Sequence, residues 1–346
     1  MRIALAAVLA LAVIGSAARA ESTTLQGAGA TFPAPLYAKW IDAYNKANPE
    51  VKVDYQAIGS GGGIKGITDR TVVFAGSDAP MTDEQLQAAP GKILHIPTVS
   101  GPVVMIYNLP EAKELRLDGA AVADIFLGKI TKWNDPKLRA LNAGVNLPDK
   151  DIVVAHRSDG SGTTWIFTNY LSKASDEWKK TVGNATSVKW PVGLGGKGNQ
   201  GVAASVKGAE GGIGYVELAY AETAALPYAA QVNQGGKAVR ASIDGVVAAA
   251  QNSISGFPED MRVSITDAPG GDSYPICGFT YLLIYQDLSY LKNRQTAEEV
   301  LKFINWGVHE GQGMAKPNYA PLPQEAQQKV EAKLKSVVFD GQPVLK

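Results

Sequence analysis

The chain has 346 residues, of which 45% are hydrophobic and 19% are charged, with 33 basic and 33 acidic side chains. Its length suits two domains of ordinary size, each able to bury a hydrophobic core. The balanced charge provides no basic field, which argues against nucleic acid and acidic membrane surfaces as partners.

The first twenty residues have the layout of an export signal. Arg2 gives a positive start, residues 3–14 form an unbroken apolar run, and residues 18–20 read Ala-Arg-Ala. The apolar run is too short to span a bilayer, which needs ~20 apolar residues. The pattern therefore predicts a signal peptide that is cleaved after Ala20, and a periplasmic protein that begins at Glu21.

Strand-like and helix-like segments alternate along the rest of the chain. Apolar or β-branched runs predict strands at residues 24–26, 51–57, 72–75, 103–107, 152–155 and 279–285. Apolar residues at helical spacing predict helices at residues 35–48, 164–172 and 297–308. This alternation indicates an α/β fold with a largely parallel sheet.

One loop, residues 157–164 with the sequence RSDGSGTT, follows a predicted strand and opens a predicted helix. The first turn of a helix has free N–H groups and a partial positive charge, which favour an anion. Ser161 and Thr163 add hydroxyl donors, and Arg157 adds a fork-shaped cation that suits phosphate oxygens. Asp159 is placed to hold that fork. An ordinary capped helix start with a surface arginine explains the same pattern.

Two further helix starts offer hydroxyls and free amides. Thr31 and Phe32 follow the first predicted strand, and Ser60 lies in a glycine-rich loop after the second. Taken singly, each segment is equally well explained by a tight turn with a capping hydroxyl. Three such helix starts in one chain favour an anion site.

Asp78 gives the sharpest indication of which anion would bind. It follows the predicted strand at 72–75. A carboxylate repels a fully ionised anion but accepts a hydrogen bond from one that still carries a proton, as phosphate does and sulfate does not at neutral pH. An unpaired buried carboxylate opposite sulfate would cost roughly 1–3 kcal/mol. The alternative is an aspartate that caps the next helix.

Metal, cofactor and disulfide chemistry have little support in the sequence. Cys277 is the only cysteine and is predicted to be a small buried residue rather than a reactive thiol. His95, His156 and His309 are scattered and lack the spacing of zinc ligands. We therefore expect neither a cofactor nor a metal.

Around these loops the chain resembles the periplasmic phosphate-binding proteins of the phosphate-specific ABC transporter. The resemblance rests on residues 27–35 (GAGATFPAP), 58–62 (IGSGG), 77–80 (SDAP), 124–133 (DIFLGKITKW), 159–163 (DGSGT), 190–201 (WPVGLGGKGNQG) and 213–217 (IGYVE). The resemblance spans nearly the whole chain after the signal.

The resemblance implies a set of phosphate ligands. The set consists of Thr31, Phe32, Ser60, Asp78, Arg157, Ser161, Gly162 and Thr163. In this set Asp78 accepts the phosphate proton, and Arg157 donates its fork while pairing with Asp159. The remaining residues supply hydroxyl and amide donors.

The resemblance also implies a two-domain fold of the type II periplasmic binding proteins, with two hinge strands and a ligand cleft between the domains. The expected boundaries are a signal peptide at 1–20, a discontinuous first domain of 21–102 and 280–346, a second domain of 103–279, and hinge strands at 103–108 and 279–285. The implied partners are inorganic phosphate and the permease subunits of the transporter, with the protein acting as a monomer.

Three alternative functions follow from the same residues. An enzyme such as a phosphatase needs a nucleophile set or a metal site, and the sequence shows neither. A binding protein for another oxyanion, such as sulfate, molybdate or arsenate, remains open, although Asp78 argues against the first two. A structural or adhesive surface protein would not need Asp78, Arg157 and Ser161 together.

Overall fold

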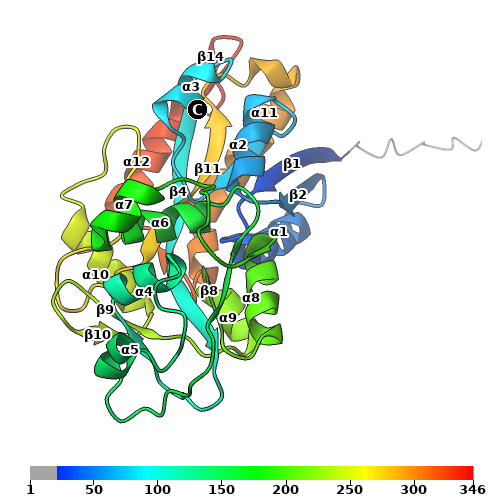
Figure 1. The fold of residues 1–346 in the computed structure, drawn as a ribbon. Coiled ribbons are helices and arrows are strands. Elements are labelled where there is room, and N and C mark those ends of the chain that lie inside the picture. Colours follow the sequence, from blue (N-terminus) through cyan, green and yellow to red (C-terminus); the bar gives the residue numbers. More distant parts are fainter. Residues whose placement is uncertain (1–21, 346) are drawn as a thin grey trace, which may run out of the picture.

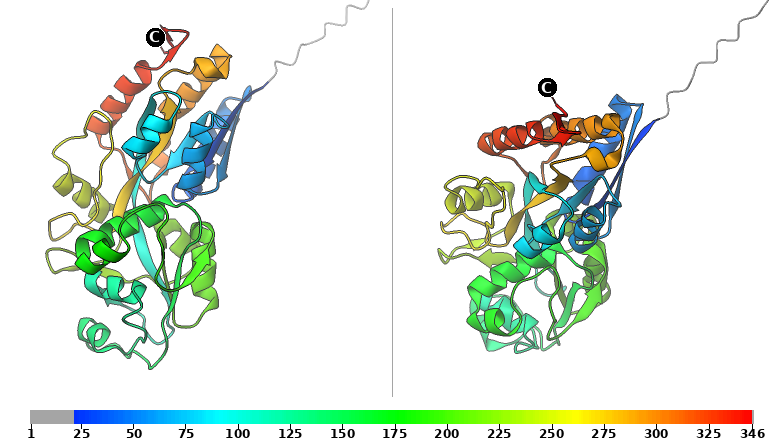
Figure 2. Two further views of the ribbon diagram at one scale, coloured as in Figure 1. Left: turned by 45° about the horizontal axis from the view of Figure 1, so that its top comes forward. Right: turned by 90° about the horizontal axis from the view of Figure 1, so that it is seen from above.

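The computed structural model describes residues 22–345. The predicted signal peptide and its cleavage site lie outside the described residues. Figures 1 and 2 show two lobes: one contains both ends of the described chain, coloured blue and orange to red, and the other contains its green middle part. We refer to them as the first lobe and the second lobe. Within residues 22–345, no helix combines the length and apolarity needed to cross a membrane.

A nine-stranded sheet runs through both lobes in the order β2-β1-β3-β11-β4-β8-β6-β7, with β12 paired to β4. Its strands are β1 (Thr23–Gly29), β2 (Val51–Ala57), β3 (Phe74–Ser77), β4 (Ile93–Asn108), β6 (Val153–Arg157), β7 (Leu194–Gly196), β8 (Gly212–Glu217), β11 (Cys277–Tyr285) and β12 (Ala320–Pro321). The pairs β1–β2, β1–β3, β6–β7 and β6–β8 are parallel. The centre is antiparallel, so the expectation of a largely parallel sheet holds only on the two flanks.

Strand β4 connects the two lobes and explains the antiparallel centre. Its first part, Ile93–Pro102, pairs with β11, and its second part, Val103–Asn108, pairs with β8. Pro102, which has no N–H to donate, stands where the strand changes partner, so the missing donor interrupts neither ladder. The predicted strand at 103–107 is therefore only the second part of a longer strand.

Strand β11 contains the second predicted hinge segment. It pairs over its whole length with the first part of β4 and also with β3, so its ladder lies in the first lobe. The chain enters it through an irregular stretch, residues 254–276. The domain boundaries remain a proposal.

Helices cover the sheet in both lobes. They are α1 (Ala34–Ala47), α2 (Ser60–Thr68), α3 (Asp83–Ala88), α4 (Gly119–Phe126), α5 (Pro136–Leu141), α6 (Gly162–Ala174), α7 (Asp176–Thr181), α8 (Gly198–Gly208), α9 (Leu218–Ala224), α10 (Ile243–Ser253), α11 (Arg294–Val308) and α12 (Gln324–Lys335). Short 3₁₀ helices span Ser289–Leu291 and Glu310–Met314, and short strands are β5 (Arg116–Leu117), β9 (Ala230–Val232), β10 (Ala238–Val239), β13 (Val338–Phe339) and β14 (Gln342–Pro343).

The predicted apolar stripe of α1 is confirmed. Leu36, Trp40 and Tyr44 are buried, and the Trp40 indole N–H donates to the carbonyl of Gly311 at 2.8 Å. This packing holds α1 against the core, and Thr31 and Phe32 lie just before the helix begins. Cys277 is also buried as predicted, and its thiol contacts the carbonyl oxygen of Tyr274 at 3.1 Å.

Candidate anion-binding site

The three predicted helix starts meet where the two lobes touch. The loop before α2 belongs to the first lobe and the loop before α6 to the second. The amide of Gly162 donates to the Ser60 hydroxyl oxygen at 3.0 Å, and the amide of Gly61 donates to the carbonyl of Gly160 at 2.9 Å. These direct contacts between loops about a hundred residues apart show that the lobes are closed upon each other.

Glycine is required where these loops touch. A Cβ at Gly162 would lie 2.5 Å from the Asp78 Cβ and 2.6 Å from the Ser60 hydroxyl oxygen. Neither distance is compatible with a side chain unless the lobes part. Gly162 therefore permits the closest approach between the two halves of the site.

Asp78 lies at the centre of this contact, immediately after β3. Its side chain is buried, and its carboxylate accepts hydrogen bonds from Thr280 Oγ1 at 2.8 Å and from the Ser60 hydroxyl at 3.4 Å. Burial raises the pKa of Asp78 to about 7, against the opposing effects of the Thr280 hydrogen bond and the Arg157 charge. Asp78 does not cap α3, because Thr82 forms the capping box of that helix. This carboxyl is therefore poised to share a proton near neutral pH.

Arg157 provides the positive charge of the site from the end of β6. The residue is only 3% exposed, and its Nε donates to Asp159 Oδ1 at 2.8 Å while Nη2 donates to Oδ2. Burial raises the pKa of Asp159, but the Arg157 fork and the amide of Gly198 outweigh it and hold that pKa below its usual value. Arg157 Nη1 is buried and has no hydrogen-bond partner within residues 22–345. A bound anion would satisfy this donor.

Hydroxyl groups from both lobes complete the cluster. Asn199 Nδ2 donates to Thr31 Oγ1 at 2.7 Å and to Thr163 Oγ1 at 3.2 Å, which leaves both hydroxyl protons free for another acceptor. The Ser161 hydroxyl oxygen caps α6 by accepting a hydrogen bond from the amide of Thr164 at 3.0 Å, as expected for an ordinary capped helix start. Its hydroxyl proton is still free to donate. Phe32 is completely buried beside them.

The structure thus brings all the predicted ligand residues to one buried junction between the lobes. It also adds residues that sequence reasoning missed, namely Thr280, Asn199, Glu217, Tyr220 and Tyr319. The sequence does mark Thr280 as unusual, because it is the only threonine in the otherwise mainly apolar strand β11. Asn199 lies in one of the segments that carry the resemblance, but nothing in its spacing indicated a role.

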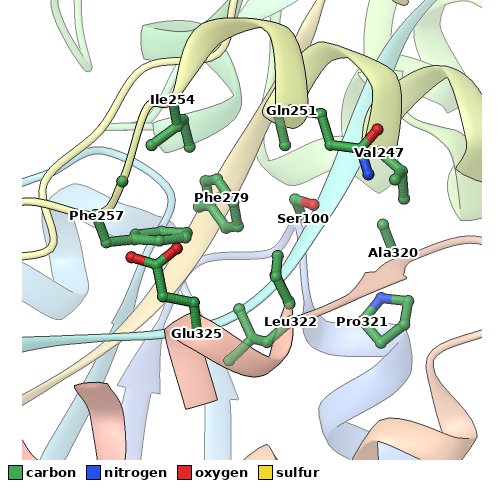
Figure 3. Close-up of a pocket in the computed structure, with 13 residues that line it drawn as sticks. Ser100, Val247, Gln251, Ile254, Phe257, Phe279, Ala320, Pro321, Leu322 and Glu325 are labelled. Carbon is green, nitrogen blue, oxygen red and sulfur yellow. The ribbon is translucent and has the colours of Figure 1, made fainter. Parts of the chain in front are cut away.

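A separate cavity of about 380 Å³ lies away from this junction, between α10, β11 and β12 (Figure 3). Its walls are mainly apolar, with Phe257, Phe279 and Leu322 among them, and it contains none of the predicted ligand residues. Such walls cannot replace the water around an anion, so the polar junction is the better candidate site. Within residues 22–345, no cluster of His, Cys, Asp or Glu is arranged to hold a metal ion.

Comparisons with known proteins give relatives over most of the chain. A family model described as a PBP superfamily domain matches residues 15–310. The phosphate-binding protein PstS of Pasteurella multocida is 46% identical over 321 residues, which cover 92% of each chain. The protein of the same name from Methanocaldococcus jannaschii is 38% identical over 323 residues, covering 86% of this chain and 82% of its own.

Solved structures share the fold. A high-affinity periplasmic phosphate-binding protein (PfluDING) bound with phosphate superposes with a TM-score of 0.71 at 22% identity, covering 90% of this chain and 93% of that chain. A putative phosphate ABC transporter substrate-binding protein with bound phosphate from Clostridium perfringens gives a TM-score of 0.63 at 19% identity, covering 87% and 100%. At these identities, the likeness establishes the fold alone.

Proposed function

We propose that this chain, which belongs to the PBP superfamily and within it to the PstS family of phosphate-binding proteins, captures inorganic phosphate and delivers it to an ABC permease for import. The chain is a binding protein and not an enzyme. Its relatives are likewise named as phosphate-binding proteins. The periplasm is the proposed place of capture.

One observation carries the choice of phosphate: the buried Asp78 carboxyl lies within the same cluster as the buried Arg157, whose Nη1 has no hydrogen-bond partner within residues 22–345. The arginine attracts an anion, and the carboxyl accepts a hydrogen bond from an anion that is still protonated. Sulfate offers no such proton, so its binding leaves Asp78 repelled and unpaired. Other oxyanions are thereby disfavoured, except arsenate, which has a similar shape and proton.

The proposed ligands are the eight predicted residues, with Asp159 holding the Arg157 fork. Thr31, Phe32, Ser60 and Asp78 come from the first lobe, and Arg157, Ser161, Gly162 and Thr163 come from the second. Because each lobe supplies half of the set, phosphate binds best when the lobes are closed. The two lobes would then be the predicted domains 21–102 with 280–346 and 103–279, working as a monomer without nucleic acid.

Calorimetric titration of phosphate-stripped protein comprising residues 21–346 tests this function. We expect tight one-to-one binding of phosphate, weaker binding of arsenate, and no heat with sulfate. Absence of phosphate heat from the stripped protein would overturn the proposal.

A further inference from the structure

A buried chain of three oxygen atoms joins the lobes beside the proposed phosphate site. Tyr319, which precedes β12 in the first lobe, places its hydroxyl oxygen 2.8 Å from the carbonyl oxygen of Phe32 and 3.0 Å from Glu217 Oε2. Glu217 ends β8 in the second lobe. All three residues are at most 2% exposed. These contacts hold the lobes together.

The number of protons shared by these three oxygen atoms indicates whether the Glu217 carboxyl is protonated. Tyr319 has a single hydroxyl proton, and the Phe32 carbonyl can only accept, so the hydroxyl can donate to Phe32 or to an ionised Glu217 but not to both. Both contacts are hydrogen bonds at the same time only if the hydroxyl donates to Phe32 and a protonated Glu217 carboxyl donates to the Tyr319 oxygen. Its other oxygen, Oε1, accepts from the amide of Ala219 at 3.0 Å. In that arrangement Oε2 carries the proton.

The surroundings of Glu217 favour the same neutral form. Burial is the largest influence and raises the pKa of Glu217 well above its usual value, while the hydrogen bond from the Ala219 amide opposes it. The acidic groups Glu222 on α9 and Asp78 in the first lobe raise this pKa further. Glu217 forms no ion pair with any lysine, arginine or histidine in the described part of the chain.

The remaining neighbours of Glu217 are uncharged in this structure. On α8, Asn199 Oδ1 accepts from the Glu217 amide at 3.0 Å. On α9, the Tyr220 hydroxyl donates to the Thr31 carbonyl at 2.6 Å, and burial raises the pKa of this phenol. On the adjacent strand β4, Glu217 lies opposite Val103. None of these groups offers a positive charge to an ionised Glu217.

We propose that Glu217 is a proton-dependent latch, which closes onto Tyr319 with uptake of one proton when phosphate draws the lobes together. The inference rests on the proposed function, because closure is driven by phosphate. When the lobes part, Tyr319 leaves Glu217, and the carboxyl meets water and ionises. The latch also positions Phe32, whose amide is a proposed phosphate ligand and whose carbonyl is held by Tyr319.

The latch predicts that phosphate affinity falls as pH rises above the pKa of Glu217 in the open form. One linked proton changes the dissociation constant by about tenfold per pH unit. Phosphate and Asp78 also titrate, so the contribution of Glu217 is obtained by comparison with Glu217→Gln. The Gln amide N–H takes the place of the acid O–H toward Tyr319, and its carbonyl still accepts from Ala219.

The test counts protons by titrating phosphate into each protein at pH 8 in two buffers with different ionisation enthalpies. On binding phosphate, we expect wild type to take up one proton more than Glu217→Gln. We also expect the dependence of the dissociation constant on pH to be about tenfold per pH unit weaker in the variant than in wild type. Glu222→Gln, which removes a neighbouring exposed carboxylate, should retain the wild-type count. Equal counts in wild type and Glu217→Gln would overturn the latch, whereas absence of phosphate binding in wild type would overturn the proposed function instead.

Infrared spectroscopy provides a second readout that does not depend on folding of the Gln variant. The phosphate-loaded wild-type protein should show a protonated-carboxyl band that shifts in Tyr319→Phe, because the acid then loses its acceptor. A band unaffected by this substitution would also overturn the latch.

Discussion

Replacement of Gly162 by alanine should separate phosphate binding from folding. The added methyl group would lie 2.5 Å from the Asp78 Cβ and 2.6 Å from the Ser60 hydroxyl oxygen, both of which belong to the other lobe. Overpacking of this kind costs about 1–3 kcal/mol. The cost falls on the closed form alone, because opening carries Gly162 away from both neighbours. We therefore expect the phosphate dissociation constant to rise by about 5- to 150-fold, with an unchanged melting temperature in the absence of phosphate.

Calorimetric titration gives the affinity, and a thermal melt of the phosphate-free protein gives the stability. Gly208→Ala is the matched control, since Gly208 is also helical and a Cβ there would have nothing within 4 Å. It should leave phosphate affinity unchanged. A Gly162→Ala protein that binds phosphate as tightly as wild type would refute the packing argument and the closed geometry on which it depends.

Three further changes test the same site. Thr280→Val keeps the shape of the side chain but removes the hydroxyl that donates to Asp78 at 2.8 Å. Because a hydrogen bond to a charged group contributes about 1.5–3 kcal/mol, calorimetry should show phosphate binding weakened by about 10- to 150-fold. An unchanged affinity would show that Thr280 has no role in binding. Arg157→Lys replaces the planar guanidinium group that Asp159 holds with a single ammonium charge. Phosphate binding should weaken by about 100-fold or more. A small loss of phosphate affinity would show that the positive charge alone suffices. In the closed form, burial raises the pKa of Asp78 to about 7 from 3.8. This group therefore favours closure of the phosphate-free protein fully below about pH 4, and its contribution of about 4 kcal/mol is lost as pH rises through about 7. Small-angle X-ray scattering should show the phosphate-free protein opening over that range, and Asp78→Asn should remove this contribution and leave only that of Glu217.

The sequence was sufficient to predict the loops that form the site, because their chemistry is local. A hydroxyl, free amides and an arginine beside a helix start are visible within the eight residues from 157 to 164. The helical stripe of α1 was likewise visible, since Leu36, Trp40 and Tyr44 recur at the helical period. The strand at 51–57 matches β2 at both ends.

Features that depend on contacts between distant segments were not visible. Strand β3 lies two residues beyond its predicted position and includes Gly76, where the absence of a side chain leaves room for the Tyr55 hydroxyl. Strand β4 continues through Pro97, which lies beside an irregularity in its pairing with β11, and through Pro102, where its partner strand changes. Asn199 lies in a glycine-rich segment that carries the resemblance, but only the tertiary structure brings its side-chain amide to Thr31.

The most direct test of the central claim compares the phosphate-to-sulfate preference of wild type with that of Asp78→Asn, by competition titration on the stripped proteins at pH 7. If Asp78 accepts a hydrogen bond from the phosphate proton, the Asn amide of the variant can donate to sulfate and no longer repels it. The preference for phosphate over sulfate should then fall by about tenfold or more. A preference that remains at the wild-type value would contradict the claim, because the choice of phosphate would then be made elsewhere in the site.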